Sequence, residues 1–136
     1  MPPADASRLI SDYDRIALGQ VFTPESVVRC MLRLRHNTGR VLEPSCGDGA
    51  FLRHLPGAVG LELDPDHCPP GAQAIDFFAY PEREQFDTLI GNPPYVRHHD
   101  IAEAWKAWNS ERFASMGIRA SALAGLHLHF FLQTRL

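Results

Sequence analysis

The 136-residue sequence lacks several features that mark special classes of protein. No window approaches the ~20 apolar residues that a membrane-spanning helix needs. The amino-terminal segment Met1–Asp5 has no basic-then-apolar pattern of a secretory signal. The three cysteines, Cys30, Cys46 and Cys68, are odd in number and widely spaced, so they predict neither a disulfide framework nor a zinc site. The sequence therefore predicts a cytoplasmic protein of a reducing compartment.

An excess of positive charge is also missing, since the formal net charge is −3. Contacts to phosphates normally supply most of the non-specific affinity for DNA or RNA. Either the partner is not a nucleic acid, or the basic surface lies elsewhere.

Histidine is plentiful near the carboxyl end, at His98, His99, His127 and His129. Residues two apart on a helix do not face each other, and no spacing of carboxylate and histidine accompanies these four. We therefore predict no metal site.

The most informative stretch is Asn92-Pro93-Pro94-Tyr95, which follows a predicted buried strand over 86–90. Two successive prolines give no N–H donors and hold the backbone extended. The Asn92 side-chain oxygen and the Pro93 carbonyl are then acceptors beside a planar ring, which suits a flat base that carries an exocyclic amine. The competing interpretation is a rigid turn with a surface tyrosine.

Two predicted elements precede that strand. Thr23 and Pro24 have the N-cap and first-turn chemistry of a helix whose apolar face is Val27, Val28, Met31 and Leu32, ending at 37–39. A strand over 40–43 then enters a turn containing Gly47, Asp48 and Gly49, with a helix to Leu55. This is the nucleotide-binding position of a doubly wound fold, although the GxGxxG spacing is absent.

Two further predicted strands, over 58–63 and 74–78, end in acidic side chains. Glu62 has the position of a carboxylate that holds ribose hydroxyls. Asp76 can accept from an adenine amino group while Phe77 lies against the ring. Taken alone, the alternatives are a turn carboxylate at Glu62, and a strand-end aspartate with core phenylalanines.

Two helices are predicted after Tyr95. Ile101, Ala104, Trp105 and Trp108 share one helical face. Ser121 has the chemistry of an N-cap for a last helix over 121–136, with Leu123, Leu126, Phe130 and Phe131 facing inward.

Taken in order, these stretches resemble the gamma-class N6-adenine DNA methyltransferases of restriction–modification systems, which use S-adenosylmethionine. The resemblance covers residues ~15–136. Its most discriminating part is Gly19–Pro24, which separates this group from other enzymes with Asn-Pro-Pro-Tyr. The matching stretches are Gly19–Pro24, Leu42–Phe51, Gly60–Asp64, Asp76-Phe77 and Asn92–Tyr95.

The resemblance implies a role for each matching side chain. Around the methionine end of the cofactor it implies Thr23, Glu43, Ser45 and Gly47. It implies Glu62 on the ribose hydroxyls, and Asp76 with Phe77 on the cofactor adenine. It implies that Asn92 and the Pro93 carbonyl, with Pro94, grip the target amine, and that Tyr95 stacks on an adenine flipped out of double-stranded DNA.

The resemblance implies an α/β, Rossmann-like methyltransferase fold that is incomplete, with the first four strands in the spatial order three, two, one, four, and an amino-terminal helix. We expect an arm over 1–14 and a partial catalytic domain over 15–136, without the later strands and the DNA-recognition domain. The fourth strand would then be an edge, so we expect self-association or a partner chain that completes the sheet.

Two alternatives stay open. The chain could instead methylate a protein glutamine, whose side-chain amide is also a planar amine, although the stretch Phe22–Pro24 argues against this. It could also be a non-catalytic cofactor-binding or assembly subunit.

Overall fold

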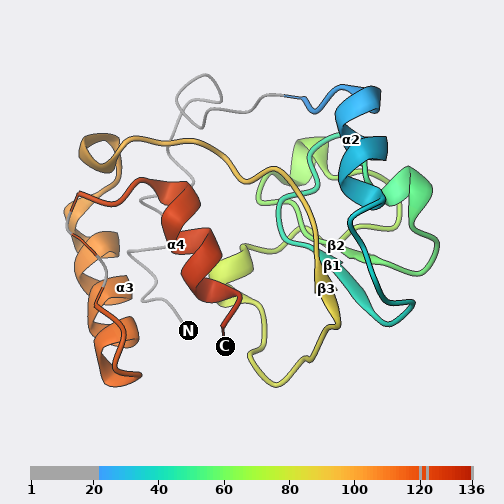
Figure 1. Ribbon diagram of the computed structural model, residues 1–136. Coiled ribbons are helices and arrows are strands. Elements are labelled where there is room, and N and C mark those ends of the chain that lie inside the picture. Colours follow the sequence, from blue (N-terminus) through green and yellow to red (C-terminus); the bar gives the residue numbers. More distant parts are fainter. Residues whose placement is uncertain (1–21, 120, 122, 136) are drawn as a thin grey trace. The chain divides into compact units, whose positions relative to one another are not determined.

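The computed structural model describes residues 22–119, 121 and 123–135 (Figure 1). The chain divides into two compact units, Val21–Asn92 and Met1–Gln20 with Pro93–Leu136. We name the described residues 22–92 the sheet unit and those from 93 to 135 the helical unit. The expected arm over 1–14 lies outside the described residues. Within them, no helix is long and apolar enough to cross a membrane.

The sheet unit begins with helix α2, Glu25–Leu32, which buries Val28 completely. Met31 and Leu32 pack against the same core, whereas Val27 is exposed. The prediction that Thr23 caps this helix is wrong, because Pro24 is the N-cap residue and no side chain caps it. The Pro24 carbonyl accepts from the N–H groups of Val27 and Val28. The helix also ends earlier than predicted, at Leu32.

Three short parallel strands follow: β1, Val41–Glu43; β2, Val59–Gly60; and β3, Thr88–Leu89. Their order is β2-β1-β3, with Leu42 opposite both Val59 and Leu89. All three residues of β1 are buried, as expected for the central strand of a parallel sheet. The predicted α/β class is confirmed, and β3, the strand predicted as fourth, lies beside the first.

The strand predicted over 74–78 is wrong. A single parallel bridge joins Leu61 to Gln73, and a 3₁₀ helix then spans Phe77–Ala79. The Asp76 Oδ1 accepts a hydrogen bond from the Phe78 N–H at 3.0 Å. A side chain that bonds to the backbone two residues ahead competes with a strand ladder, which explains the turn.

The glycine turn after β1 is confirmed, but the predicted helix is only the 3₁₀ helix Leu52–His54. Gly47 has φ +52°, in the left-handed region that other residues rarely adopt. The Asp48 Oδ1 accepts from the Ala50 N–H at 3.2 Å, which closes the turn locally. Phe51 and Leu55 then enter the core with Val41 and Ile90.

The helical unit contains α3, Glu103–Ser115, and α4, Leu126–Gln133. Trp105, Asn109 and Phe113 are the buried residues of α3; Trp108 is only half-buried and Ala104 is exposed. The prediction of a Ser121 cap is wrong: α4 begins after Gly125, and the Ser121 Oγ accepts from the Leu123 N–H instead.

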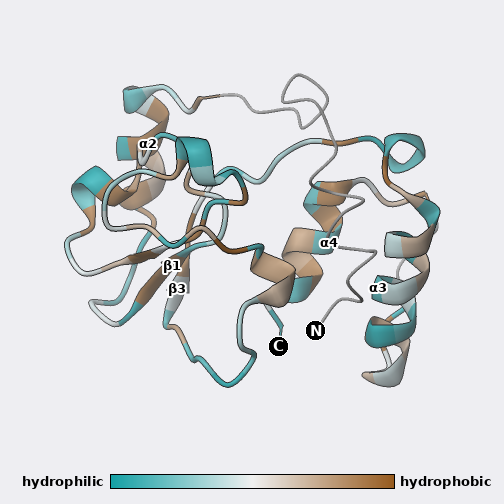
Figure 2. Cartoon of the chain, turned by 180° about the vertical axis from the view of Figure 1, so that it is seen from behind, coloured by the Kyte–Doolittle hydropathy of each residue, from teal (hydrophilic) through white to brown (hydrophobic). Residues whose placement is uncertain are grey.

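Helix α4 is apolar around most of its surface, as its brown colour in Figure 2 shows. Leu126 and Phe130 face inward as predicted. Leu123, before the helix, is 71% exposed, and Phe131 is 66% exposed, so that part of the prediction is wrong.

Two polar contacts join α3 to α4. The Asn109 Nδ2 and the His129 Nδ1 lie 2.9 Å apart, and Arg112 donates to the Gln133 Oε1. Arg112 follows Asn109 by three residues on α3, and Gln133 follows His129 by four residues on α4. The helices therefore run parallel, as Figure 1 shows.

Candidate functional site

The polar side chains of interest in the sheet unit lie at the carboxyl edge of the sheet. Glu43 ends β1, Glu62 lies two residues after the end of β2, and Asn92 lies three residues after the end of β3. In open α/β sheets ligands bind at this edge.

A small cavity of about 40 Å³ opens at this edge. It brings together five of the predicted site residues, namely Thr23, Glu43, Ser45, Gly47 and Asn92. Glu62, Asp76 and Phe77 do not line it. The remaining lining residues are Phe22, Cys46, Asp48, Ala50 and Phe51. Phe22, which is 68% exposed, was missed by the sequence analysis as a site residue.

Glu43 is the most perturbed acid of the cavity. It is 2% exposed, and its Oε2 has no hydrogen-bond partner among the described residues. Burial, followed by the charges of Asp48 and Glu62, raises the pKa of Glu43 to about 8, while a backbone hydrogen bond from Leu52 opposes the rise. The Ser45 Oγ is also buried without a partner. Two unpaired oxygens at one cavity indicate a place for polar groups of a ligand.

Glu62 is buried at 4% exposure and holds two backbone groups. Its Oε2 accepts from the Gly47 N–H at 2.9 Å, and its Oε1 accepts from the Asp64 N–H at 3.0 Å. The carboxylate thereby fixes the glycine turn against the end of β2. Because a carboxylate has about four acceptor positions, each oxygen can still accept from a ligand hydroxyl.

Asp76 and Phe77 lie at the 3₁₀ turn that replaces the predicted third strand. The Asp76 Oδ2 is buried and has no partner in the described part of the chain. Burial raises the pKa of Asp76, and the Phe78 N–H opposes the rise. An unpaired buried acceptor is consistent with an amino group as partner, and Phe77 is itself buried.

Asn92 is held from a distant part of the sequence. Its Nδ2 donates to the Thr23 Oγ1 at 3.4 Å. This contact links the segment that follows β3 to the residue that precedes Pro24 at the start of α2. Sequence spacing offers no signal for it, since the two residues are 69 positions apart.

Pro93, Pro94 and Tyr95 open the helical unit. Tyr95 is 59% exposed, and its ring centroid lies 5.1 Å from that of His127, with the planes tilted by 33°. The approach needs Gly125, because a Cβ there would lie 2.9 Å from the His127 Cε1 and 3.0 Å from the Val96 carbonyl oxygen. His127 supports Tyr95 on one side, a role that the sequence analysis did not foresee.

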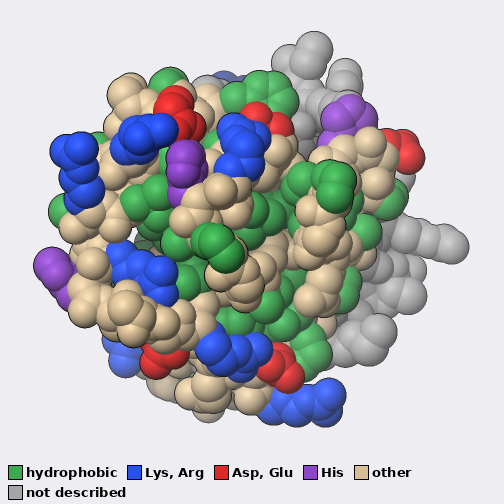
Figure 3. All heavy atoms as spheres, turned by 90° about the vertical axis from the view of Figure 1, so that its right-hand side faces the viewer, with side chains coloured by type: hydrophobic (Ala, Val, Ile, Leu, Met, Phe, Trp, Pro, Cys, Tyr) green, Lys and Arg blue, Asp and Glu red, His purple; other side chains and the backbone are tan. Residues whose placement is uncertain are grey.

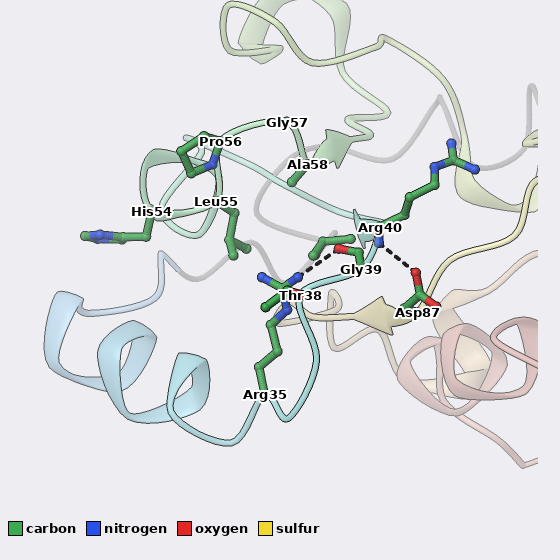
Figure 4. A pocket seen from close by; sticks show the side chains of 11 residues that line it. Arg35, Thr38, Gly39, Arg40, His54, Leu55, Pro56, Gly57, Ala58 and Asp87 are labelled. Atoms are coloured by element: carbon green, nitrogen blue, oxygen red, sulfur yellow. Dashed lines mark hydrogen bonds between the residues drawn. The ribbon is translucent and has the colours of Figure 1, made fainter.

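A larger cavity of about 510 Å³ lies at the opposite, amino edge of the sheet (Figure 4). Arg40, Ala58 and Asp87, each just before a strand, help to line it. Two of its polar contacts are internal: the Arg35 Nη2 donates to the Gly39 carbonyl at 2.8 Å, and the Arg40 N–H donates to the Asp87 Oδ2 at 2.7 Å. The Arg35 Nε is buried without a partner among the described residues. It contains no predicted site residue. Figure 3 shows Lys and Arg side chains around apolar surface on the side of the molecule that carries α2.

The described residues contain no group of three or more His, Cys, Asp or Glu side chains that could hold a metal ion. Among the histidines, His129 is buried against Asn109, and His127 contacts Tyr95.

Comparisons with known proteins find relatives among the methyltransferases. The family model described as Eco57I restriction-modification methylase matches residues 68–128, which include Asn92–Tyr95. Type II methyltransferase M.XamI of Xanthomonas campestris pv. amaranthicola is 41% identical over 143 residues, 87% of this chain and 27% of the relative. Type II methyltransferase M.TthHB8I of Thermus thermophilus is 40% identical, over 70% of this chain and 23% of the relative. Type II methyltransferase M.HincII of Haemophilus influenzae is 36% identical, over 71% and 21%.

The chain is therefore related to the DNA methyltransferases of restriction–modification systems, and the predicted resemblance to that family is confirmed. Its named relatives are Type II methyltransferases. The chain spans about a quarter of the length of the first two.

Proposed function

We propose that the chain takes part in transfer of a methyl group from S-adenosylmethionine to the N6 amino group of an adenine in double-stranded DNA, as a gamma-class enzyme. One observation carries the proposal: Asn92 lines the same cavity as Glu43, Ser45 and Gly47. An acceptor for an amine and a set of polar groups for a cofactor thus share one edge of the sheet.

The residues at the cavity fit the methionine end of that cofactor. Its ammonium group suits the unpaired Glu43 Oε2, and its carboxylate suits the hydroxyl of Ser45. The backbone at Gly47 is open, since a Cβ there would meet nothing within 4 Å. We assign Thr23 to the same wall, Glu62 to the ribose hydroxyls, and Asp76 with Phe77 to the adenine.

S-adenosylmethionine, when bound, supplies an electrophilic methyl group on sulfur. The chain's own part is to make an aromatic amine reactive. The nitrogen lone pair of adenine is delocalised, and two acceptors, the Asn92 Oδ1 and the Pro93 carbonyl, favour a pyramidal nitrogen whose lone pair points at the methyl group. Pro94 keeps this tip extended, and the exposed ring of Tyr95 stacks on the flipped base.

The family names favour DNA over a protein glutamine as the substrate. With DNA as substrate, the proposed compartment is the cytoplasm. Transfer of a labelled methyl group to unmethylated duplex DNA, to protein, or to neither distinguishes this proposal from glutamine methylation and from a non-catalytic subunit.

Asn92→Ala tests the assignment most directly. We expect it to abolish methyl transfer while the affinity for S-adenosylmethionine, measured by calorimetry, stays nearly unchanged. Gln85→Ala is the matched control, because it removes an exposed carboxamide outside the cavity. Turnover by Asn92→Ala equal to that of Gln85→Ala would contradict the role of Asn92.

We also propose that a second chain pairs with β3. In the described sheet, β3 pairs with β1 on one side only, so its other side has backbone groups that a further strand can use. The partner is a second copy or a chain that supplies further strands.

A further inference from the structure

Thr23 and Asn92 meet through their side chains at the small cavity. The Asn92 Nδ2 donates to the Thr23 Oγ1 at 3.4 Å, and both residues line the cavity. The Thr23 hydroxyl does not cap α2, since the N-cap residue is Pro24 and no side chain caps that helix. Among the described residues, the hydroxyl therefore has no capping role that would explain its position.

An asparagine side chain has two chemically different ends. Rotation of the amide by 180° exchanges the acceptor Oδ1 with the donor Nδ2. An acceptor facing a target amine receives its hydrogen bond, whereas an NH₂ group facing the same amine sets donor against donor. The proposed reaction therefore needs one of the two orientations of Asn92.

The contact between the two side chains fixes which end of the amide meets Thr23. A hydroxyl has one proton to donate and two lone pairs. The Thr23 Oγ1 accepts from the Asn92 Nδ2 with one of its lone pairs. The Asn92 Oδ1, at the other end of the amide, is therefore directed away from Thr23.

We propose that Thr23 is a positioning residue, which holds the Asn92 amide so that Oδ1 faces the target amine. The inference rests on the proposed role of Asn92 as the acceptor for that amine. It assigns Thr23 a task beyond that of lining the cofactor pocket: the hydroxyl acts on the reaction through Asn92.

The bond can be observed without turnover. We would record the side-chain amide signals of Asn92 by ¹⁵N NMR in the full chain and identify them by their loss in Asn92→Ala. In Thr23→Val, which keeps the shape and removes the hydroxyl, the signals should move to values of a solvent-exposed asparagine and exchange faster. Thr23→Ser, which keeps the hydroxyl, should restore the wild-type signals. Unchanged Asn92 signals in Thr23→Val would overturn the proposal.

Turnover tests the consequence. Loss of one neutral hydrogen bond corresponds to roughly 2–10-fold in the population of the correct orientation. We expect kcat of Thr23→Val to fall by that factor at saturating S-adenosylmethionine, with KM for DNA unchanged, and Thr23→Ser to recover most of the rate. A loss of cofactor affinity in Thr23→Val with intact Asn92 signals would make Thr23 a wall of the pocket only. Absence of cofactor binding by the wild type would refute the proposed function, while the NMR comparison would still decide the contact.

Discussion

Replacement of Glu43 by glutamine should change the pH dependence of folding stability. Glu43 is 2% exposed, and burial with the nearby charges of Asp48 and Glu62 raises its pKa to about 8. In the unfolded chain the same group titrates near its ordinary value of 4.5. The folded chain therefore holds this proton more tightly than the unfolded chain does.

The sign and size follow from linkage. The stability that Glu43 contributes is fully present below about pH 4.5 and is lost as the pH rises through about 8. At about 1.4 kcal/mol per pH unit, the total loss over this range is about 5 kcal/mol. This is a large part of the stability of a typical domain, which is roughly 5–15 kcal/mol.

Urea unfolding of Glu43→Gln and wild type at pH values from 5 to 8.5 checks the expectation. Glutamine cannot ionise. We therefore expect the free energy of unfolding of the variant to decrease much less as the pH rises, so that the variant is the more stable protein at pH 8. Glu111→Gln, an exposed change on α3, is the control and should keep the wild-type slope. If the free energy of unfolding depended on pH in the same way in wild type and Glu43→Gln, the assignment of this pH dependence to Glu43 would be refuted.

The remaining predictions concern the cofactor, the buried histidine and the edge of the sheet. Glu62→Ala should weaken S-adenosylmethionine binding by roughly 1.5–3 kcal/mol, the value of hydrogen bonds to a charged group; equal Kd values by calorimetry would contradict the pocket. Burial lowers the pKa of His129, so its contribution to stability should be lost as pH falls below about 6.5, and His129→Gln should show a flatter acid limb in urea unfolding. Sedimentation at micromolar concentration should show self-association through β3, unless a partner chain is required; a cooperative monomer whose Leu89 amide is protected in hydrogen exchange would refute pairing at that edge.

Local chemistry was enough to predict much of the sheet unit. The proline after Thr23 directly precedes helix α2, glycine at 47 permits the left-handed turn, and the apolar run over 86–90 contains β3. The assignment of Glu43 to the site rests instead on the family resemblance, and the structure shows this residue buried at the end of the central strand.

Long-range contacts explain what could not be predicted. The bond between Thr23 and Asn92 joins residues 69 positions apart, and His127, on α4, contacts Tyr95, which lies outside any helix. The strand predicted over 74–78 does not form for a local reason. The Phe78 N–H donates to the Asp76 side chain, and this bond favours a turn over the strand that the apolar pattern indicates. Helical periodicity also does not show whether another element packs on a given face. Phe131 is therefore exposed although burial was predicted.

The parallel arrangement of α3 and α4 places like ends of two helix dipoles beside each other, which is unfavourable. A shift of one helix by a turn would break the Asn109–His129 contact and leave two buried polar groups unpaired. The buried pair therefore fixes the register. The Leu126 N–H, at the start of α4, donates to the carbonyl of Val96, the residue after Tyr95, at 2.9 Å. The register of α4 therefore also affects the position of the backbone next to Tyr95. The direction of the proposed base-stacking ring thus depends on a polar pair that need never touch DNA.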